Sequence, residues 1–284
     1  MRELTAAADL RAFVREARGA GRRLALVPTM GFLHEGHLAL VDAARRAADA
    51  VVMSVFVNPL QFGPGEDLDR YPRDLARDRA LARGRGVDAL FVPAAAEMYR
   101  PGADTRVVPG AAAERWEGAA RPGHFTGVLT VVTKLLHLAE PDVVCFGQKD
   151  IQQAILVRRM LRDLDWPVEL VLVPTVREPD GLALSSRNVY LDAAARARAG
   201  SLSRGLRAAE AAFRAGARSA AALEAAVRRE LAAAPGVEAD YIAVAEPDAM
   251  QPVAEARDGT IVAVAARIGR TRLIDNVILR EGAG

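Results

Sequence analysis

The sequence predicts an α/β fold: a doubly wound (Rossmann-like) parallel sheet followed by a second, smaller α+β C-terminal domain. Up to residue 173, short apolar runs alternate with amphipathic helical patterns. After Pro174 the pattern changes to two Ala/Arg-rich helical stretches and then strand-like runs. The turn signal Pro179–Asp180–Gly181 lies between the two parts. We therefore expect one domain over residues 1–176 and another over residues 177–284.

The elements of the first domain follow from periodicity and from the residues that end each run. The continuous run at 51–57 is typical of a strand buried on both faces. We expect strands at 22–27, 51–57, 87–92, 142–146 and 168–173, and helices at 36–50, 71–84, 123–139 and 151–164. The stretch from 93 to about 122 carries no clear pattern.

In the second domain, two helices are expected within 192–233. Antiparallel strands are expected at 238–245 and 260–267, with a possible third at 272–279.

Composition excludes several classes of protein. The chain has 284 residues, is 51% hydrophobic and 26% charged, and holds no apolar run that could span a membrane. The N-terminus mixes acids and bases, unlike a signal peptide. The single cysteine, Cys145, excludes a disulfide framework, so we expect a cytoplasmic protein. The net charge is only +2 and the basic residues are scattered along the chain, so we expect no nucleic-acid partner. Without an apolar span we also expect no membrane partner.

Residues 28–37, Pro-Thr-Met-Gly-Phe-Leu-His-Glu-Gly-His, join the first strand to the first helix. Open α/β sheets bind ligands at the carboxyl ends of strands, and helix N-termini suit phosphate. His34 and His37 lie three residues apart, so both rings share one face of a helical turn. The metalloprotease pattern needs a spacing of four, so donation to a phosphate is favoured over zinc binding. Helix capping by the two histidines is an equally good interpretation.

The segment Val-Asn-Pro-Leu-Gln-Phe-Gly, residues 57–63, follows the second strand, which should neighbour the first. Gln61 there carries both a donor and an acceptor and suits a hydroxyl or a carboxylate. A simple Asn-Pro turn is the alternative.

The segment Phe-Gly-Gln-Lys-Asp-Ile-Gln-Gln, residues 146–153, follows the fourth strand. Gly147 permits a close approach of the backbone to a ligand, and Lys149 suits a phosphate. Gln153 either contacts a ligand or forms a capping box with Asp150.

The segment Leu-Ser-Ser-Arg-Asn, residues 184–188, offers two hydroxyls and a guanidinium in a loop, which suits an anion, although an ordinary polar linker has the same composition. A loop between domains could also close over a bound nucleotide. The chain lacks both the dinucleotide-binding glycine motif and the Walker A motif.

Five segments resemble the pantothenate synthetase family, also called the pantoate–β-alanine ligases. They are PTMGFLHEGH, SVFVNPLQFGPGEDLDRYPRD, RPGHFTGVLTVVTKLL, FGQKDIQQ and VREPDGLALSSRN, in that order. The C-terminal third is similar to the family mainly in length and pattern. The family belongs to the nucleotidyltransferases with a HIGH-type motif, here HEGH. Its SSRN segment is similar in role to the KMSKS loop of class I aminoacyl-tRNA synthetases.

The resemblance implies an AMP-forming ligase that joins pantoate to β-alanine by a carbon–nitrogen bond. Pantoate would attack the α-phosphate of ATP to give pantoyl adenylate and pyrophosphate. The amine of β-alanine would then give pantothenate and AMP. Mg²⁺ would accompany ATP, and the resemblance implies a cytoplasmic homodimer of two-domain subunits. No metal ligand is assigned.

The resemblance also implies roles for residues of this chain. His34 and His37 would act on the phosphates with Lys149 and Arg187, His37 being the proton donor. The expected ATP contacts are Met30, Gly31, Phe32, Leu33, His34, Glu35, Gly36, His37, Gly147, Gln148, Lys149, Asp150, Val176, Leu184, Ser185, Ser186 and Arg187.

Gln61 and Gln153 would hold the pantoate or β-alanine substrate. Arg121 and His124 are expected to face the site without an assigned role, and Asp78 is not assigned. Leu184 replaces the methionine that is more usual in the family, and because the two are similar in volume we expect little consequence.

Two alternatives stay open. One is another HIGH-type adenylyltransferase that acts on a different small acid, and the other is a module that binds ATP without turning it over.

Overall fold

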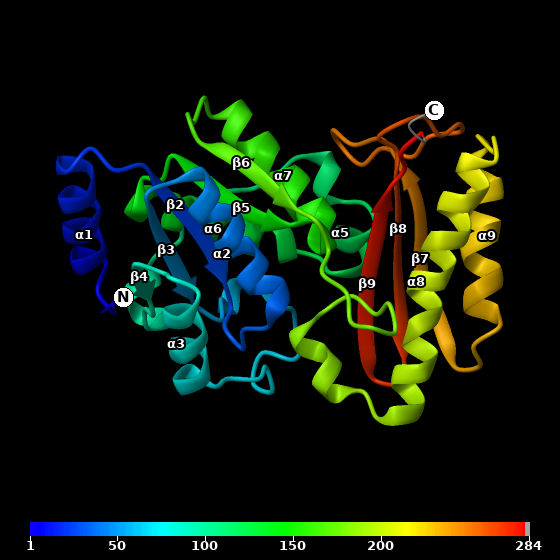
Figure 1. Ribbon diagram of the computed structural model, residues 1–284, viewed down its shortest axis with the longest axis horizontal. Coiled ribbons are helices and arrows are strands. Elements are labelled where there is room, and N and C mark those ends of the chain that lie inside the picture. The colour runs from blue at the N-terminus through cyan, green and yellow to red at the C-terminus, as the bar shows by residue number, and fades with distance from the viewer. Residues whose placement is uncertain (282–284) are drawn as a thin grey trace. The chain divides into compact units, whose positions relative to one another are not determined.

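The computed structural model describes residues 1–281. The chain falls into two compact units, each assembled from several segments (Figure 1). The first comprises residues 1–110, 121–147 and 156–174. The second comprises residues 111–120, 148–155 and the described residues from Thr175 onward.

A six-stranded parallel sheet forms the centre of the first unit. In their order across the sheet, the strands are β1 (Arg2–Leu4), β4 (Ala89–Phe91), β3 (Ala50–Val55), β2 (Leu24–Thr29), β5 (Val143–Gly147) and β6 (Glu169–Val173). β2 is paired with β3 on one side and with β5 on the other. The direction of winding reverses between β2 and β5, and the carboxyl ends of strands at such a switch point are where open α/β sheets bind ligands.

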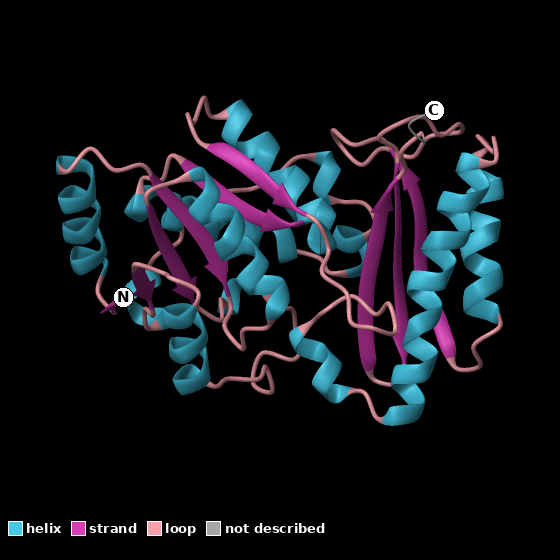
Figure 2. Cartoon of the chain, viewed as in Figure 1, coloured by secondary structure: helices cyan, strands magenta, loops and turns pink. Residues whose placement is uncertain are grey.

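Helices connect these strands (Figure 2). They are α1 (Ala7–Gly19), α2 (Glu35–Ala47), α3 (Leu75–Gly84), α4 (Ala95–Met98), α6 (His124–Ala139) and α7 (Ile151–Asp163), with the short 3-10 helix η1 (Pro59–Gln61). Val27 of β2 lies in one buried cluster with Val41 of α2 and Ala82 of α3. Leu26 is also fully buried and points to the opposite face, because side chains alternate along a strand. The sheet is therefore buried on both faces.

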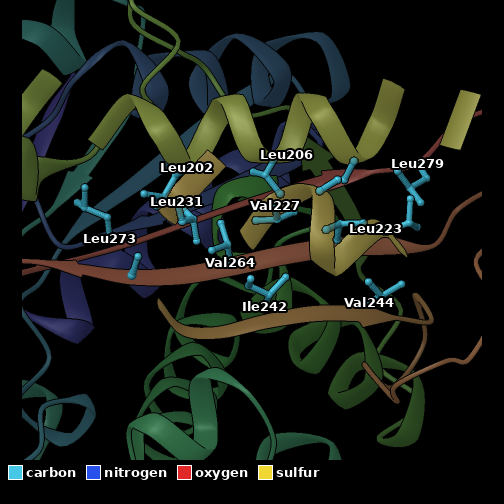
Figure 3. Close-up of a cluster of buried hydrophobic side chains, with 14 of the residues drawn as sticks. Leu202, Leu206, Leu223, Val227, Leu231, Ile242, Val244, Val264, Leu273 and Leu279 are labelled. Atoms are coloured by element: carbon cyan, nitrogen blue, oxygen red, sulfur yellow. The ribbon is translucent and has the colours of Figure 1, made fainter. Parts of the chain in front are cut away.

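The second unit is built on an antiparallel sheet, β7 (Val237–Ala245), β8 (Ile261–Ile268) and β9 (Thr271–Ile278). Its two long helices are α8 (Ala193–Arg214) and α9 (Ala220–Ala232). Figure 3 shows their common core, in which Leu206 and Val227 lie in one cluster with Ile242 and Val264. The shorter elements of this unit are η2 (Ala111–Ala113), α5 (Glu117–Ala120), η3 (Gln148–Asp150) and η4 (Ser186–Tyr190).

The predicted fold class is confirmed, and four details differ. Helix α1 (Ala7–Gly19) was not among the helices expected from the sequence. β1 was not predicted, because a three-residue strand with one buried side chain carries no periodicity. The helix expected from Tyr71 begins at Leu75, because the Asp74 side chain accepts a hydrogen bond from the Arg77 N–H (3.0 Å) and caps it. The stretch expected to be irregular contains the four-residue helices α4 and α5.

Within residues 1–281, no helix is long and apolar enough to cross a bilayer. Cys145 is fully buried on β5, and burial raises the pKa of its thiol to about 11. A thiol with that pKa stays protonated at neutral pH, so Cys145 is a core residue and not a nucleophile.

Candidate active site

The loop after β2 has left-handed backbone at two consecutive residues. Gly31 has a φ of +83° and Phe32 a φ of +50°. A Cβ at Gly31 would lie 2.8 Å from Val55 Cγ1 and 2.9 Å from Asp78 Oδ2, so glycine is required there. Phe32 has no such freedom, and left-handed backbone costs a non-glycine residue about 1–2 kcal/mol. Contacts from elsewhere must therefore hold Phe32 in this conformation.

Two adjacent side chains of α3 supply those contacts. The Asp78 carboxylate accepts hydrogen bonds from the N–H groups of Phe32 (2.8 Å) and Leu33 (2.7 Å). Arg77 donates to the Leu33 carbonyl (2.7 Å), and its guanidinium lies 5.5 Å from the centre of the Phe32 ring. Asp78 is only 1% exposed, and this burial raises its pKa, an effect that the two N–H donors and Arg77 oppose. Helix α3 thus fixes the path of the loop that leads to the two histidines.

His34 and His37 meet at the N-terminus of α2. His34 is the N-cap residue, and its Nδ1 accepts from the Gly36 N–H (3.1 Å). The Nδ1 of His37 lies 3.3 Å from the His34 N–H, and the two ring centres are 4.0 Å apart. An Nδ1 that accepts places the hydrogen of a neutral imidazole on Nε2. The capping interpretation is therefore confirmed for Nδ1, and it is compatible with a donor role for Nε2–H.

A buried amide network follows β3. Asn58 is 1% exposed, and its Nδ2 donates to Gln61 Oε1 and to the Gly127 carbonyl, both at 3.1 Å. Its Oδ1 accepts from the Tyr99 hydroxyl (2.8 Å), and burial raises the pKa of Tyr99, so this hydroxyl remains a donor. Gln61 Nε2 lies 3.0 Å from Met30 Sδ. The structure thus brings Gln61 beside the loop that follows β2.

Arg121 and His124 hold the backbone of Gln61. The Gln61 carbonyl lies 2.8 Å from His124 Nδ1 and 3.3 Å from Arg121 Nη2, while Arg121 Nη1 lies 3.1 Å from His124 Nε2. Because arginine can only donate, His124 accepts at Nε2 and donates from Nδ1.

Glu66 binds Arg121 through two hydrogen bonds of 2.8 and 2.6 Å. Burial alone would raise the pKa of Glu66, but the hydrogen bonds and charge of Arg121 hold it below its usual value. These ionic contacts keep Arg121 in place beside Gln61.

Gly127 allows α6 to approach η1 closely. A Cβ at Gly127 would lie 2.1 Å from the Leu60 carbonyl oxygen and 2.6 Å from the Gln61 N. No side chain fits between these two backbones, so Gly127 sets the distance from α6 to the segment that carries Gln61.

The third predicted segment begins where β5 ends at Gly147 and continues as η3. Lys149 is 19% exposed, and its Nζ lies 3.6 Å from Asp150 Oδ2. The Gln148 side chain donates to Asn276 Oδ1 (3.2 Å), in the same unit.

Gln153 lies half-buried on the first turn of α7. Its neighbour Gln152 is 4% exposed, and its Nε2 donates to the carbonyls of Ala112 (2.9 Å) and Arg115 (3.0 Å). Gln152 is therefore a structural residue.

Residues 176–184 form a tight hairpin. The Leu184 N–H donates to the Val176 carbonyl (3.0 Å), and the Glu178 N–H donates to the Leu182 carbonyl (2.8 Å). Gly181 takes a φ of +88° at the turn, where the sequence predicted one. The hairpin brings two predicted ATP contacts, Val176 and Leu184, opposite each other.

Ser185 follows the hairpin as the cap of η4, and its Oγ accepts from the Arg187 N–H (3.2 Å). Ser186 is 7% exposed. This short cap fixes the backbone of the loop at Arg187.

Two predicted ATP contacts are engaged elsewhere in the chain. Leu33 is fully buried in the core, and its N–H and carbonyl both bind α3. Glu35 pairs with Arg85 (3.0 Å) through a side chain that is 62% exposed. For both residues an ATP contact stays a prediction.

Asp78 is a functional candidate that the sequence analysis did not assign. The sequence indicates its burial only weakly: Asp78 is a charged residue four positions before Ala82, which places both on the same, buried side of α3. Nothing local in the sequence indicates its partners, which lie 45 and 46 residues away.

The family model for pantoate-beta-alanine ligase matches residues 2–278. A pantothenate synthetase of Moorella thermoacetica is 51% identical over 279 residues, covering 98% of this chain and 99% of the relative. A pantothenate synthetase of Chloroflexus aurantiacus is 55% identical over 271 residues, covering 95% of this chain and 96% of that relative.

Among solved structures, pantothenate synthetase from Thermus thermophilus matches with a TM-score of 0.94 at 50% identity, covering 99% of this chain and 100% of that one. A pantoate-beta-alanine ligase from Francisella tularensis, complexed with beta-gamma ATP and beta-alanine, matches with a TM-score of 0.81 at 32% identity, covering 98% and 97%. With a family model across nearly its whole length and relatives above 50% identity, the chain belongs to the pantoate–β-alanine ligase family and is a ligase.

Proposed function

We propose that the chain condenses pantoate with β-alanine in two steps at the expense of ATP. The pantoate carboxylate attacks the α-phosphorus of ATP, and pyrophosphate leaves. The β-alanine amine then attacks the acyl carbon of the pantoyl adenylate, and AMP leaves as pantothenate forms. The family match and the ATP and β-alanine named for the Francisella relative support this proposal.

The first step needs negative charge to be neutralised, because a carboxylate must approach a triphosphate. His34 and His37 lie at the N-terminus of α2 with Nδ1 facing backbone N–H groups, so the Nε2–H of each neutral ring would be the donor to a phosphate. Lys149 and Arg187 would add two further positive charges. A donor of this kind aimed at a transition-state oxygen typically contributes about 2.7–4 kcal/mol, or 10²–10³ in rate.

Pantoate recognition is proposed for Gln61 and Gln153. Gln61 is 8% exposed and is held at its backbone carbonyl by His124 and at its side chain by Asn58. A buried, immobilised amide discriminates between substrates, because one without the matching hydroxyl would leave the second N–H of Gln61 Nε2 without an acceptor. Asn58, Arg121 and His124 thus position Gln61.

Gly147 supports a ligand beside the end of β5. A Cβ at this residue would meet no described atom within 4 Å, so packing within residues 1–281 does not account for a glycine there. The close approach of a nucleotide to the backbone does account for it.

Mg²⁺ is proposed to reach the site on the triphosphate, where it would neutralise part of the phosphate charge. Within residues 1–281, no group of three or more His, Cys, Asp or Glu residues could hold a metal ion. Mg²⁺ usually keeps several waters and binds through one or two carboxylates and the substrate phosphates. We propose no protein ligand for it.

The single observation that carries this proposal is the placement of His34, His37 and Gln61 at the carboxyl ends of adjacent strands β2 and β3, in a chain of this family. The test is AMP release from ATP with pantoate alone, with β-alanine alone and with both. We expect stoichiometric AMP release only with both. Turnover without any need for β-alanine would indicate another adenylyltransferase, and binding without turnover an ATP-binding module.

We further propose that the protein is a cytoplasmic homodimer whose subunit divides into domains at about residue 176. Sedimentation at micromolar concentration should give twice the chain mass of 30.3 kDa. A monomer at that concentration that retains full activity would contradict the dimer.

A further inference from the structure

Two consecutive buried residues of β9, Asp275 (3% exposed) and Asn276 (1% exposed), bind the segments of the second unit that carry proposed ATP contacts. The Nδ2 of Asn276 donates to the carbonyls of Gln148 (2.8 Å) and Lys149 (3.0 Å). Its Oδ1 accepts from Gln148 Nε2 (3.2 Å). Both the nitrogen and the oxygen of the Asn276 amide therefore form hydrogen bonds with η3, the short helix that carries Lys149.

Asp275 binds the hairpin at residues 176–184. Its carboxylate accepts from Arg177 at Nη1 (2.6 Å) and Nη2 (3.0 Å), and the same Nη1 donates to the Gly181 carbonyl (3.2 Å). Arg177 pairs with Ala183 across the hairpin. The hairpin leads directly into Ser185 and Arg187, so its anchor also sets where that loop begins.

We infer that the Asp275–Asn276 pair positions Lys149 and the residue 184–187 loop for catalysis. The pair touches no substrate and acts through the backbone of residues that do, so both are positioning residues. The inference rests on the proposed function of Lys149. It assigns a role to the C-terminal sheet that goes beyond burying a core.

The physical need for such a device follows from the lysine side chain. Lys149 carries a compact charge on a flexible four-carbon stem, so only its backbone can be fixed firmly. A displacement of about 1 Å at a reacting geometry can cost about 10²-fold in rate. Because η3 spans only three residues, it has few backbone hydrogen bonds of its own. The Asn276 side chain donates hydrogen bonds to two of its carbonyl groups.

The geometry requires an amide at residue 276. N276A removes all three hydrogen bonds. N276D keeps the size but sets a carboxylate oxygen against two carbonyl oxygens, which repel it. When that introduced carboxyl is protonated it can donate again. The two variants should therefore differ in the pH dependence of kcat/KM at temperatures where both stay folded, whereas a role in stability alone would change only their melting temperatures.

The experiment measures kcat and KM for ATP in the full chain with N276A, N276D, K149A and L273A, at saturating pantoate and β-alanine. Leu273 is a matched control, because it is a buried core residue of the same strand (5% exposed) without a bond to η3. We expect kcat/KM to fall about 10²-fold in N276A, and K149A to fall at least as far. L273A should lower the melting temperature yet keep nearly normal turnover below it.

We also expect the ratio of N276D to wild-type activity to rise as pH falls, while the N276A ratio stays flat. Should N276A fail to fold, the pH profile of the isosteric N276D carries the test. Normal turnover in N276A beside an inactive K149A would overturn this inference alone. Normal turnover in K149A would remove Lys149 from the mechanism, and this inference with it.

Discussion

Replacing Asp78 with asparagine tests whether helix α3 sets the geometry of the loop after β2. Asparagine keeps one acceptor oxygen but turns an NH₂ group toward one of two backbone N–H donors, those of Phe32 and Leu33. One charge-assisted bond is lost, and the left-handed backbone of Phe32 loses support. We expect the substitution to harm activity much more than stability.

The magnitude follows from the bond that is lost. A hydrogen bond to a charged group contributes about 1.5–3 kcal/mol. If the loop geometry is needed in the transition state, kcat/KM for ATP should fall about 10- to 150-fold.

Stability should respond differently, because burial raises the pKa of Asp78 above its unfolded value. The folded state then binds more protons, so this residue's contribution to the unfolding free energy declines as pH rises from about 3.9 through the raised pKa. D78N removes this pH-dependent loss of stability. At neutral pH that gain offsets part of the stability lost with the hydrogen bond.

The assay is steady-state turnover with varied ATP, together with thermal melting. D74N is the control, because Asp74 caps the same helix and asparagine caps equally well. It should leave both activity and melting temperature nearly unchanged. An unaltered kcat/KM in D78N, or an equal loss in D74N, would refute the role of Asp78.

Three further predictions concern the residues proposed to bind pantoate and their neighbours. G127A should destabilise the fold by about 1–3 kcal/mol and raise KM for pantoate, because a Cβ would clash with the Leu60 carbonyl. Thermal melting measures the first effect and steady-state kinetics the second. Because the pKa of Glu66 is lowered in the folded state, the unfolding free energy of the wild type should fall as pH drops below about 4.3. Denaturant titrations across pH should show that E66Q lacks this part of the fall. Q153A should chiefly raise KM for pantoate; a lowered melting temperature with normal kinetics would instead assign Gln153 to capping.

Local patterns in the sequence were enough to predict most of the fold. The buried run of β3 and the helical spacing of α2 produce a signal within a few residues, so each predicted element was placed within about four residues of its observed bounds. β1 was missed because its stability comes from pairing with β4, far along the chain. A strand of three residues has no periodicity to detect.

The position of the candidate site was predictable in part, for the same reason. His34, His37 and Gln61 stand at strand ends, where the order of elements alone brings them to one edge of the sheet. Asp78 and Asn276 act on segments 45 and 128 residues away, respectively, and no spacing rule connects them. Asn276 lies in none of the segments from which the sequence predicted a site, and only the fold shows that it binds Gln148.

Pyrophosphate–ATP exchange measures the proposed adenylate most directly. Purified protein is incubated with Mg²⁺, ATP, labelled pyrophosphate and pantoate, without β-alanine. The reversible first step predicts that label enters ATP, and that this requires pantoate. Absence of exchange from folded protein that still forms pantothenate would contradict the two-step reaction.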